Sequence, residues 1–187
     1  EPTGLSEKQV FALDQYLMKG GTVLLSTGGY KAQLSQSSLT ASPNDSGLSA
    51  WLSHMGVSIG ESLVMDSQNS SFPVPVSRNV GGFTFQDLVM LDYPYFVNVR
   101  GEGLNDVLPI SSGIPQVTVS WASPIEIEPG DSIDVIPLLR SSAGSWLSSE
   151  TDVMPRLNES GLSAFESTGV QDAHTVGTLL TGTFNSY

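Results

Sequence analysis

Residues 56–60 are Gly-Val-Ser-Ile-Gly and match the G-x-S-x-G pattern of serine hydrolases. In those enzymes a sharp turn from a strand into a helix exposes the serine, and a histidine base follows later in the chain, as His174 does here. The order of elements around Ser58 is reversed, since a helical pattern precedes it and a strand pattern follows it. The pattern therefore indicates a helix-to-strand connection, and serine hydrolysis stays an alternative that labelling of Ser58 would test.

None of the other candidate motifs in the sequence predicts a catalytic centre, a metal site or a cofactor. Gly28-Gly29 lacks both the third glycine of a dinucleotide fingerprint and the G-K-[ST] of a phosphate loop. Cysteine is absent, which excludes thiolate nucleophiles and cysteine metal sites. His54 and His174 lie far apart, whereas metal sites gather denser ligands. Four acidic residues lack the spacing of a calcium loop and indicate a solvated hairpin: Glu126, Glu128, Asp131 and Asp134.

Polar and aromatic side chains follow two apolar runs and form a candidate binding site. Asp66, Gln68 and Asn69 come directly after one predicted strand, and Trp121 and Ser123 lie at the end of another. The carboxyl ends of neighbouring parallel strands meet at one edge of a sheet, where ligands bind. A carboxylate, amides and an indole would suit a polar ligand such as a glycan or a peptide. The alternative is that Asp66 and Asn69 bond to turn backbone groups and that Trp121 belongs to the core.

The elements that would position these residues begin with an amphipathic helix over residues 5–21. Ser6 and Gln9 have the spacing of a capping box, and two glycines end the helix. The apolar run 22–26 follows at once and predicts a strand buried on both faces. A helix, a glycine turn and a buried strand are typical of an α/β unit. A polar connection then leads to a second helix over residues 48–55.

Strand patterns dominate the rest of the chain. Core or half-buried strands are predicted at residues 63–65, 88–91, 117–121, 125–128, 133–139 and 176–184. We expect 69–82 to be extended, the two strands beside Pro129-Gly130 to pair around that turn, and 141–172 to be a loop with a helical fragment near 162–167. We therefore predict a single α/β domain over residues 1–187. Its Rossmann-like, mainly parallel sheet is flanked by helices, with a β-rich addition in the second half.

Charge excludes two classes of partner. The chain has 19 acidic and seven basic side chains, a formal net charge of −12, and its Lys and Arg residues are scattered singly. Nucleic-acid binding and docking on anionic lipid both need clustered positive charge, so neither is expected. The charge-free stretch 107–125 contains three prolines and a glycine, which is wrong for a membrane-spanning helix. The chain has no leader pattern, and we expect it to be part of a longer protein.

An ordered set of segments resembles the auxiliary domain of ABC-type transport systems, including the accessory subunit of the gliding-motility transporter. The segments are LSEKQVFALDQYLMKGGTVLL (5–25), GLSAWLSHMGVSIGESLVMDSQN (47–69), PVPV (73–76), LDYPYFVNVRG (91–101), LPISSGIPQVTVSWASPIEI (108–127) and GTLLTGTFNSY (177–187). They cover most of the chain except the loop near 141–172.

The resemblance implies properties that composition does not show. Such a domain faces the periplasm or the cell exterior, is tethered to the cytoplasmic membrane by segments outside it, and works with permease and ATPase subunits. Its sheet is of the Rossmann-like, glutamine-amidotransferase type, and no catalytic residues carry over. The leading hypothesis is therefore a non-catalytic extracytoplasmic domain that mediates contact with partners or cargo. The alternatives are a domain that binds a glycan or a peptide, and a serine hydrolase.

Overall fold

The computed structural model describes residues 2–35, 38–128 and 132–187. These residues form two α-helices, one short 3-10 helix and eleven strands. In chain order the elements are α1 (Glu7–Met18), β1 (Tyr30–Leu34), β2 (Leu39–Pro43), α2 (Ser49–His54), β3 (Val57–Ile59), β4 (Leu63–Asp66), β5 (Asn69–Val80), β6 (Phe83–Arg100), η1 (Gly101–Gly103), β7 (Gln116–Ser120), β8 (Ile125–Ile127), β9 (Ile133–Arg140), β10 (Ser145–Ser148) and β11 (Thr175–Gly182).

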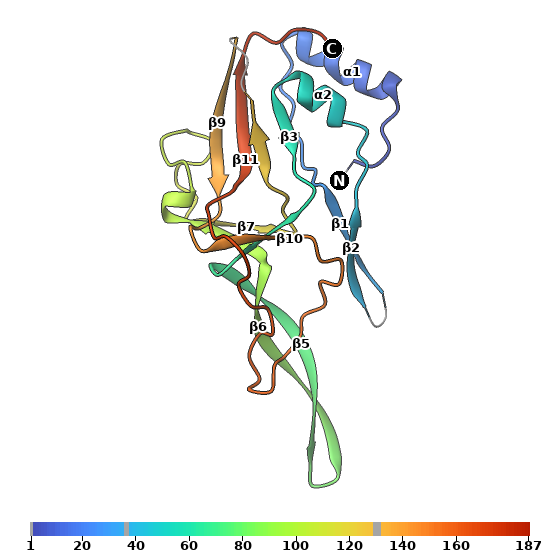
Figure 1. Ribbon diagram of the computed structural model, residues 1–187, viewed down its shortest axis with the longest axis vertical. Coiled ribbons are helices and arrows are strands. Elements are labelled where there is room, and N and C mark those ends of the chain that lie inside the picture. Colours follow the sequence, from blue (N-terminus) through green and yellow to red (C-terminus); the bar gives the residue numbers. More distant parts are fainter. Residues whose placement is uncertain (1, 36–37, 129–131) are drawn as a thin grey trace.

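The prediction of a Rossmann-like, mainly parallel sheet flanked by helices is wrong. All the strand pairs among the described residues are antiparallel and form small sheets: β1–β2, β3–β8, β4–β10, β9–β11 and β5–β6–β7. Parallel neighbours need crossover connections, usually helices, whereas antiparallel strands need only short turns. Here α1 precedes the first strand, and α2 connects β2 to β3, which belong to different sheets, so neither helix is a crossover between parallel neighbours. Both helices lie together at one end of the molecule (Figure 1).

The first helix behaves as predicted, and the segment after it does not. The Gln9 Oε1 accepts a hydrogen bond from the Ser6 backbone N–H at 2.9 Å, as capping-box spacing requires. The prediction of a buried strand over residues 22–26 is wrong, since these residues have no regular secondary structure and Leu24 is 92% exposed. The polar connection predicted after them contains the β1–β2 hairpin instead. α2 confirms the predicted second helix.

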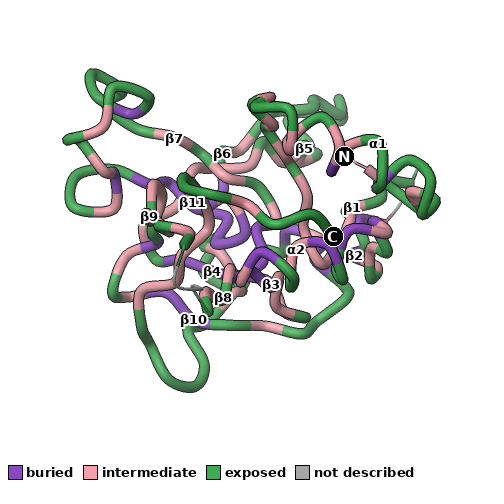
Figure 2. Tube along the Cα trace, turned by 90° about the horizontal axis from the view of Figure 1, so that it is seen from above, coloured by how far each residue is buried: buried purple, intermediate pink, exposed green. Residues whose placement is uncertain are grey.

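Three clusters of buried side chains form the core. One joins α1 to α2 through Val10, Trp51 and Met55. The other two lie on either side of β4, whose four residues are all buried, as its apolar sequence predicts. β4 pairs with β10, and the Val64 N–H donates to the Ala122 carbonyl at 2.8 Å. Figure 2 shows the buried residues collected at the centre of the molecule, with exposed loops around them.

Strands of the second half are where the sequence predicts them, but their pairing differs. β7 is half-buried and β11 closes the chain, as predicted. β8 and β9 do not pair with each other: β8 pairs with β3, and β9 pairs with β11. The Pro129-Gly130 turn predicted between them lies outside the described residues. The helical fragment predicted near 162–167 is wrong, since that stretch is irregular apart from an isolated bridge at Ser163.

The β5–β6 ribbon extends away from the body as a long projection (Figure 1). β6 has 18 residues, and its first half is exposed whereas its second half is buried. The prediction that residues 88–91 form a core strand is therefore wrong for half of them: Leu88 is 71% exposed and Met90 is 63% exposed, while Leu91 is buried. Apolar character alone does not separate a core strand from one that projects into solvent.

Candidate functional site

We call residues 73–90 the arm. Its strands pair in unbroken register from Pro73↔Met90 to Val80↔Phe83, and Gly81-Gly82 makes the turn between them. Both glycines have positive φ, 60° and 85°, which a two-residue type I′ hairpin turn requires. An added Cβ at either glycine would meet nothing within 4 Å. The glycines are therefore needed for their backbone conformation, not for space, and they build a regular ribbon.

The arm carries large apolar side chains in solvent. Val80, Phe83 and Phe85 lie on one face of the ribbon, because Val80 pairs with Phe83 and alternate residues share a face. Leu88 and Met90 are exposed on the opposite face. Scattered exposed apolar residues are ordinary in proteins, whereas a concentration of them marks an interaction surface. The arm is such a concentration.

The arm is electrically neutral, unlike the chain as a whole. Arg78 and Asp87 are its charged residues, and they form an ion pair with Nε and Oδ2 3.3 Å apart. The pair is exposed and contributes about 0–1 kcal/mol, so its main effect is to cancel charge. The chain carries a formal net charge of −12. A neutral, apolar projection on an acidic protein suits an apolar partner better than a charged one.

A group of aromatic residues, the aromatic root, holds the base of the arm. Tyr93 and Tyr95 are fully buried, with ring centroids 5.4 Å apart. Phe96 meets Tyr93 edge-on at 4.9 Å and Trp121 at 5.1 Å. The remaining members are Phe72, at 5.1 Å from Tyr93, and Phe165, at 5.4 Å from Tyr95. Edge-on aromatic pairs add to the energy of burial, so the root stabilises the arm where it leaves the body.

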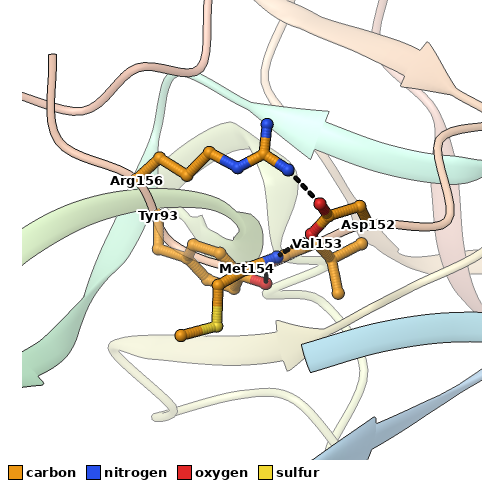
Figure 3. Close-up of polar contacts among 5 residues, drawn as sticks. All are labelled: Tyr93, Asp152, Val153, Met154 and Arg156. Carbon is orange, nitrogen blue, oxygen red and sulfur yellow. Dashed lines mark hydrogen bonds and ion pairs between the residues drawn. The ribbon is translucent and has the colours of Figure 1, made fainter. Parts of the chain in front are cut away.

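Tyr93 also ties the root to a distant segment (Figure 3). Its hydroxyl donates to the Val153 carbonyl at 2.5 Å. The same hydroxyl accepts from Trp121 Nε1 at 3.2 Å. Burial raises the pKa of Tyr93 far above its ordinary value of 10.0, although the Trp121 bond opposes the shift. Tyr93 is therefore a neutral donor. Beside it, Asp152 accepts from the Met154 N–H at 3.1 Å and pairs with Arg156.

An irregularity in the β5–β6 pairing separates the arm from the body. Asn69 pairs with Val97 but Ser70 pairs with Tyr93, so residues 94–96 have no opposite residue in β5. The Asn69 side chain fills the gap: its Oδ1 accepts from the Tyr93 N–H at 2.9 Å, and its Nδ2 donates to the Asp66 carbonyl at 3.1 Å. Such bulges bend a strand. The bulge redirects β6 out of the body.

The structure brings four of the five predicted ligand residues to this junction. Asp66 is fully buried, and its carboxylate accepts from the Ser142 N–H at 2.6 Å, the Ser142 hydroxyl at 2.5 Å and the Gln68 N–H at 2.8 Å. Asn69 and Trp121 both contact Tyr93, Asn69 at its backbone N–H and Trp121 at its hydroxyl.

The fifth predicted residue, Ser123, lies elsewhere. Its hydroxyl accepts from the Gly29 N–H at 3.0 Å, and the side chain is buried. Trp121 has a φ of 51°, a left-handed conformation that is rare outside glycine. Its backbone N–H donates to the Tyr95 carbonyl at 2.9 Å. The polar groups of the predicted site bond to the protein itself, and ligand binding by them stays a prediction.

A cavity of about 660 Å³ lies next to this junction. Gln68 and Ser142 line it together with two arginines, Arg100 at the end of β6 and Arg140 at the end of β9, and with Glu102. Neither arginine has a carboxylate within 4 Å among residues 2–35, 38–128 and 132–187. The sequence does not reveal this pair, because 40 positions separate its members and only the fold brings them to one cavity.

The residues of the hydrolase pattern are on separate elements. Ser58 lies within β3, and its hydroxyl is 3.5 Å from Glu126 Oε2 on β8. His174 lies beside Ser141, with its backbone N–H 2.8 Å from the Ser141 hydroxyl. In the part of the chain that the structure describes, no three His, Asp or Glu side chains gather as metal ligands. None of the described helices combines the length and the apolar character needed to cross a membrane.

The sequence interpretation missed the arm, although a signal for it exists. Gly81-Gly82 separates two runs in which apolar residues alternate, and two glycines between such runs are a strong hairpin signal. Pro73 and Pro75 obscured it, since proline is rare within sheets. Both prolines are in β5, which is one of the two edge strands of its sheet.

Comparison with known families agrees with the resemblance found in the sequence. The chain belongs to the auxiliary family described as "ABC-type uncharacterized transport system", whose sequence profile matches residues 1–187. The family associates the chain with an ABC transport system and suggests a non-enzymatic role. No curated protein and no solved structure matches the chain. The likeness to the gliding-motility accessory subunit stays a prediction.

Proposed function

We propose that the chain is a non-catalytic, extracytoplasmic domain that binds the permease of its transport system through the arm. Segments outside residues 1–187 would tether it to the cytoplasmic membrane. A domain on that side of the membrane reaches the permease directly, whereas it reaches the cytoplasmic ATPase only through the permease. The observation that carries the proposal is the concentration of exposed apolar side chains on a neutral arm.

The energetics favour a partner for the arm. Fully burying a Phe, Leu or Met side chain contributes about 1.5–3 kcal/mol relative to leaving it in water. Phe83 and Leu88 are 72% and 71% exposed, on opposite faces of the ribbon. A partner that covers either face gains much of this energy. The aromatic root lowers the entropic cost of binding, because it orders the base of the arm beforehand.

The test is co-purification of the permease with the full-length protein from detergent-solubilised membranes. We expect the double variant Phe83→Ser, Leu88→Ser to lower permease recovery by more than about tenfold, because two anchoring side chains are lost. The matched control is Leu24→Ser, Val170→Ser, which removes two apolar side chains that are even more exposed (92% and 86%) from other surfaces. Equal recovery with both double variants would show that the arm is not the binding surface.

A second candidate function is recognition of a glycan or a peptide beside Asp66, Asn69 and Trp121. The cavity that Gln68 shares with Arg100 and Arg140 supports it. Within the part of the chain that the structure describes, no carboxylate lies within 4 Å of either arginine. Such arginines suit the terminal carboxylate of a peptide, which they bind through two parallel hydrogen bonds.

Thermal shift with short peptides that have free or amidated carboxyl termini tests this function. A ligand that binds only the folded state raises the midpoint of unfolding. We expect free termini to raise it, amidated termini to have less effect, and Arg100→Ala with Arg140→Ala to remove the difference. A panel of glycans and peptides without any shift would exclude the second function and leave the first unaffected.

A further inference from the structure

The two long edges of the arm differ in chemistry. In a two-residue type I′ hairpin the residues that flank the turn, Val80 and Phe83, form a hydrogen-bonded pair, and such pairs recur at every second position. The residues between them direct their N–H and C=O groups away from the partner strand. On β5 these outward positions include 73, 75, 77 and 79, and on β6 they include 84, 86, 88 and 90.

The β5 edge is blocked. Pro73 and Pro75 occupy outward positions, and proline has no N–H to donate. Both residues keep the ladder to β6 intact, since their missing donors would have pointed into solvent. Prolines at such positions are a common protection against unwanted strand pairing. An added strand cannot form a regular ladder along this side of the arm.

The β6 edge has no such protection. Its outward positions are Thr84, Gln86, Leu88 and Met90, none of which is charged or a proline. Within the described residues, β6 from Phe83 to Met90 pairs only with β5. Natural edge strands usually carry a charge, a proline or a covering element because bare N–H and C=O groups recruit other strands. The β6 edge therefore presents N–H and C=O groups, unpaired among the described residues, to an incoming strand, next to the apolar side chains of Leu88 and Met90.

The same edge is already occupied further along the strand. β7 pairs with β6 from Phe96 to Arg100, and the Trp121 N–H donates to the Tyr95 carbonyl at 2.9 Å. Beyond Trp121 the chain leaves the edge and enters β8. A strand added beside residues 84–90 would thus extend the sheet along the side that β7 occupies.

We propose that an extended, uncharged segment of the permease adds as a strand to the β6 edge of the arm at residues 84–90. This inference rests on the proposed function and specifies how the arm binds. Backbone hydrogen bonds supply part of the affinity, and alternating apolar side chains of the added strand pack beside Leu88 and Met90. A second copy of this chain is a poorer occupant, because two proteins of net charge −12 repel each other.

Gln86→Pro tests the inference. It removes one outward N–H and places a proline opposite the added strand, as Pro75 does on the other edge, without removing a bond to β5. The matched control, Gln86→Thr, keeps the N–H and the strand preference. We expect Gln86→Pro to lower recovery of the permease by more than about tenfold and Gln86→Thr to leave it unchanged.

A second measurement does not depend on the folding of a variant. Hydrogen exchange of the wild-type protein, alone and in complex with the permease, reports on the backbone N–H groups of Gln86, Leu88 and Met90. We expect their exchange to slow on binding, since they become donors in a ladder, while Ser77 and Asn79 on the β5 edge change little.

The outcomes separate this inference from the proposed function. If Gln86→Pro retains the permease and the edge amides stay unprotected while Phe83→Ser, Leu88→Ser loses it, strand addition is overturned and docking through the arm stands. If neither variant affects recovery, both are overturned. If the isolated protein sediments as a dimer that Gln86→Pro converts to a monomer, the occupant is a second copy of this chain, which also overturns addition of a permease strand.

Discussion

β6 contains two regions of opposite character within one strand. Its distal half, Phe83–Met90, exposes four of its five large apolar side chains, whereas its proximal half, Leu91–Arg100, buries most of its residues among aromatic rings and polar networks. Both halves have strand-forming sequences rich in apolar residues. The difference shows that one strand can supply stability at one end and leave the other free for a partner. Substitutions should therefore affect folding in the proximal half and binding in the distal half.

The largest expected effect is loss of the root. Tyr93→Ala removes a fully buried ring in contact with four other aromatic rings, and we expect it to lower the free energy of unfolding by about 3–5 kcal/mol. Urea denaturation followed by tryptophan fluorescence measures the change. A loss below about 1 kcal/mol would contradict the assignment of the root as the stabilising region.

The second-largest effect on stability is expected at Asp66, which lies where the arm joins the body. Asp66→Ala leaves the Ser142 and Gln68 donors without their charged acceptor, and we expect a loss of about 1.5–3 kcal/mol in the free energy of unfolding. Urea denaturation of the variant and of Asp45→Ala, a carboxylate in an exposed turn, measures it. Equal effects of the two substitutions would show that the buried network does not stabilise the junction.

Two neighbouring tyrosines allow a finer test of the root. The Tyr93 hydroxyl has two hydrogen-bond partners, whereas the Tyr95 hydroxyl is buried, with the Ser148 side chain beside it but no partner in hydrogen-bond geometry among the described residues. We expect Tyr93→Phe to cost about 1–3 kcal/mol and Tyr95→Phe to be close to neutral, because only the first leaves buried groups unsatisfied. The midpoints of thermal unfolding of the two variants, each compared with the wild type, test this expectation. The reverse order would place the stabilising contact at Tyr95.

Acid should also lower the stability of the folded protein through Asp14, a buried carboxyl on α1. Burial raises the pKa of Asp14, but hydrogen bonds from Ser186, Tyr187, Trp51 and Gln15 outweigh it and hold the pKa below its ordinary value of 3.8. A carboxyl with a lowered folded-state pKa stabilises the fold above pH 3.8, and this contribution is lost as the pH falls through the folded-state value. We expect Asp14→Asn to reduce the acid dependence of unfolding. If the free energy of unfolding of Asp14→Asn depended on pH as that of the wild type does, the stabilising role of the Asp14 carboxylate would be contradicted.

The smallest effect on stability is expected in the distal half. Phe83→Ser removes a large apolar side chain that is 72% exposed and contacts mainly solvent, so the free energy of unfolding should change by less than about 0.5 kcal/mol. The same variant contributes to the largest expected loss of permease binding. A marked destabilisation by Phe83→Ser would remove the distinction between the two halves of β6.

Several local structures could be predicted from the sequence because the signals lie within a few residues. The Ser6 and Gln9 spacing located the start of α1, and the apolar run at β4 indicated a buried strand. Asp66, Gln68, Asn69 and Trp121, four of the five candidate ligand residues, lie near the base of the arm, and ligand binding by them stays a prediction. They lie at a bulge of an antiparallel ribbon and not at the edge of a parallel sheet, because strands far apart in the chain pair antiparallel.

The sequence by itself determined the family, the acidic charge, the position of both helices and the position of several strands, among them β4, β7, β9 and β11, since each depends on local pattern or on ordered segments. Only the tertiary structure decided which strands pair, which half of β6 is buried, and that Arg100 and Arg140 share one cavity. The physical reason is that strand pairing joins residues far apart in the chain. An apolar strand has the same local sequence whether its partner is the core or another protein.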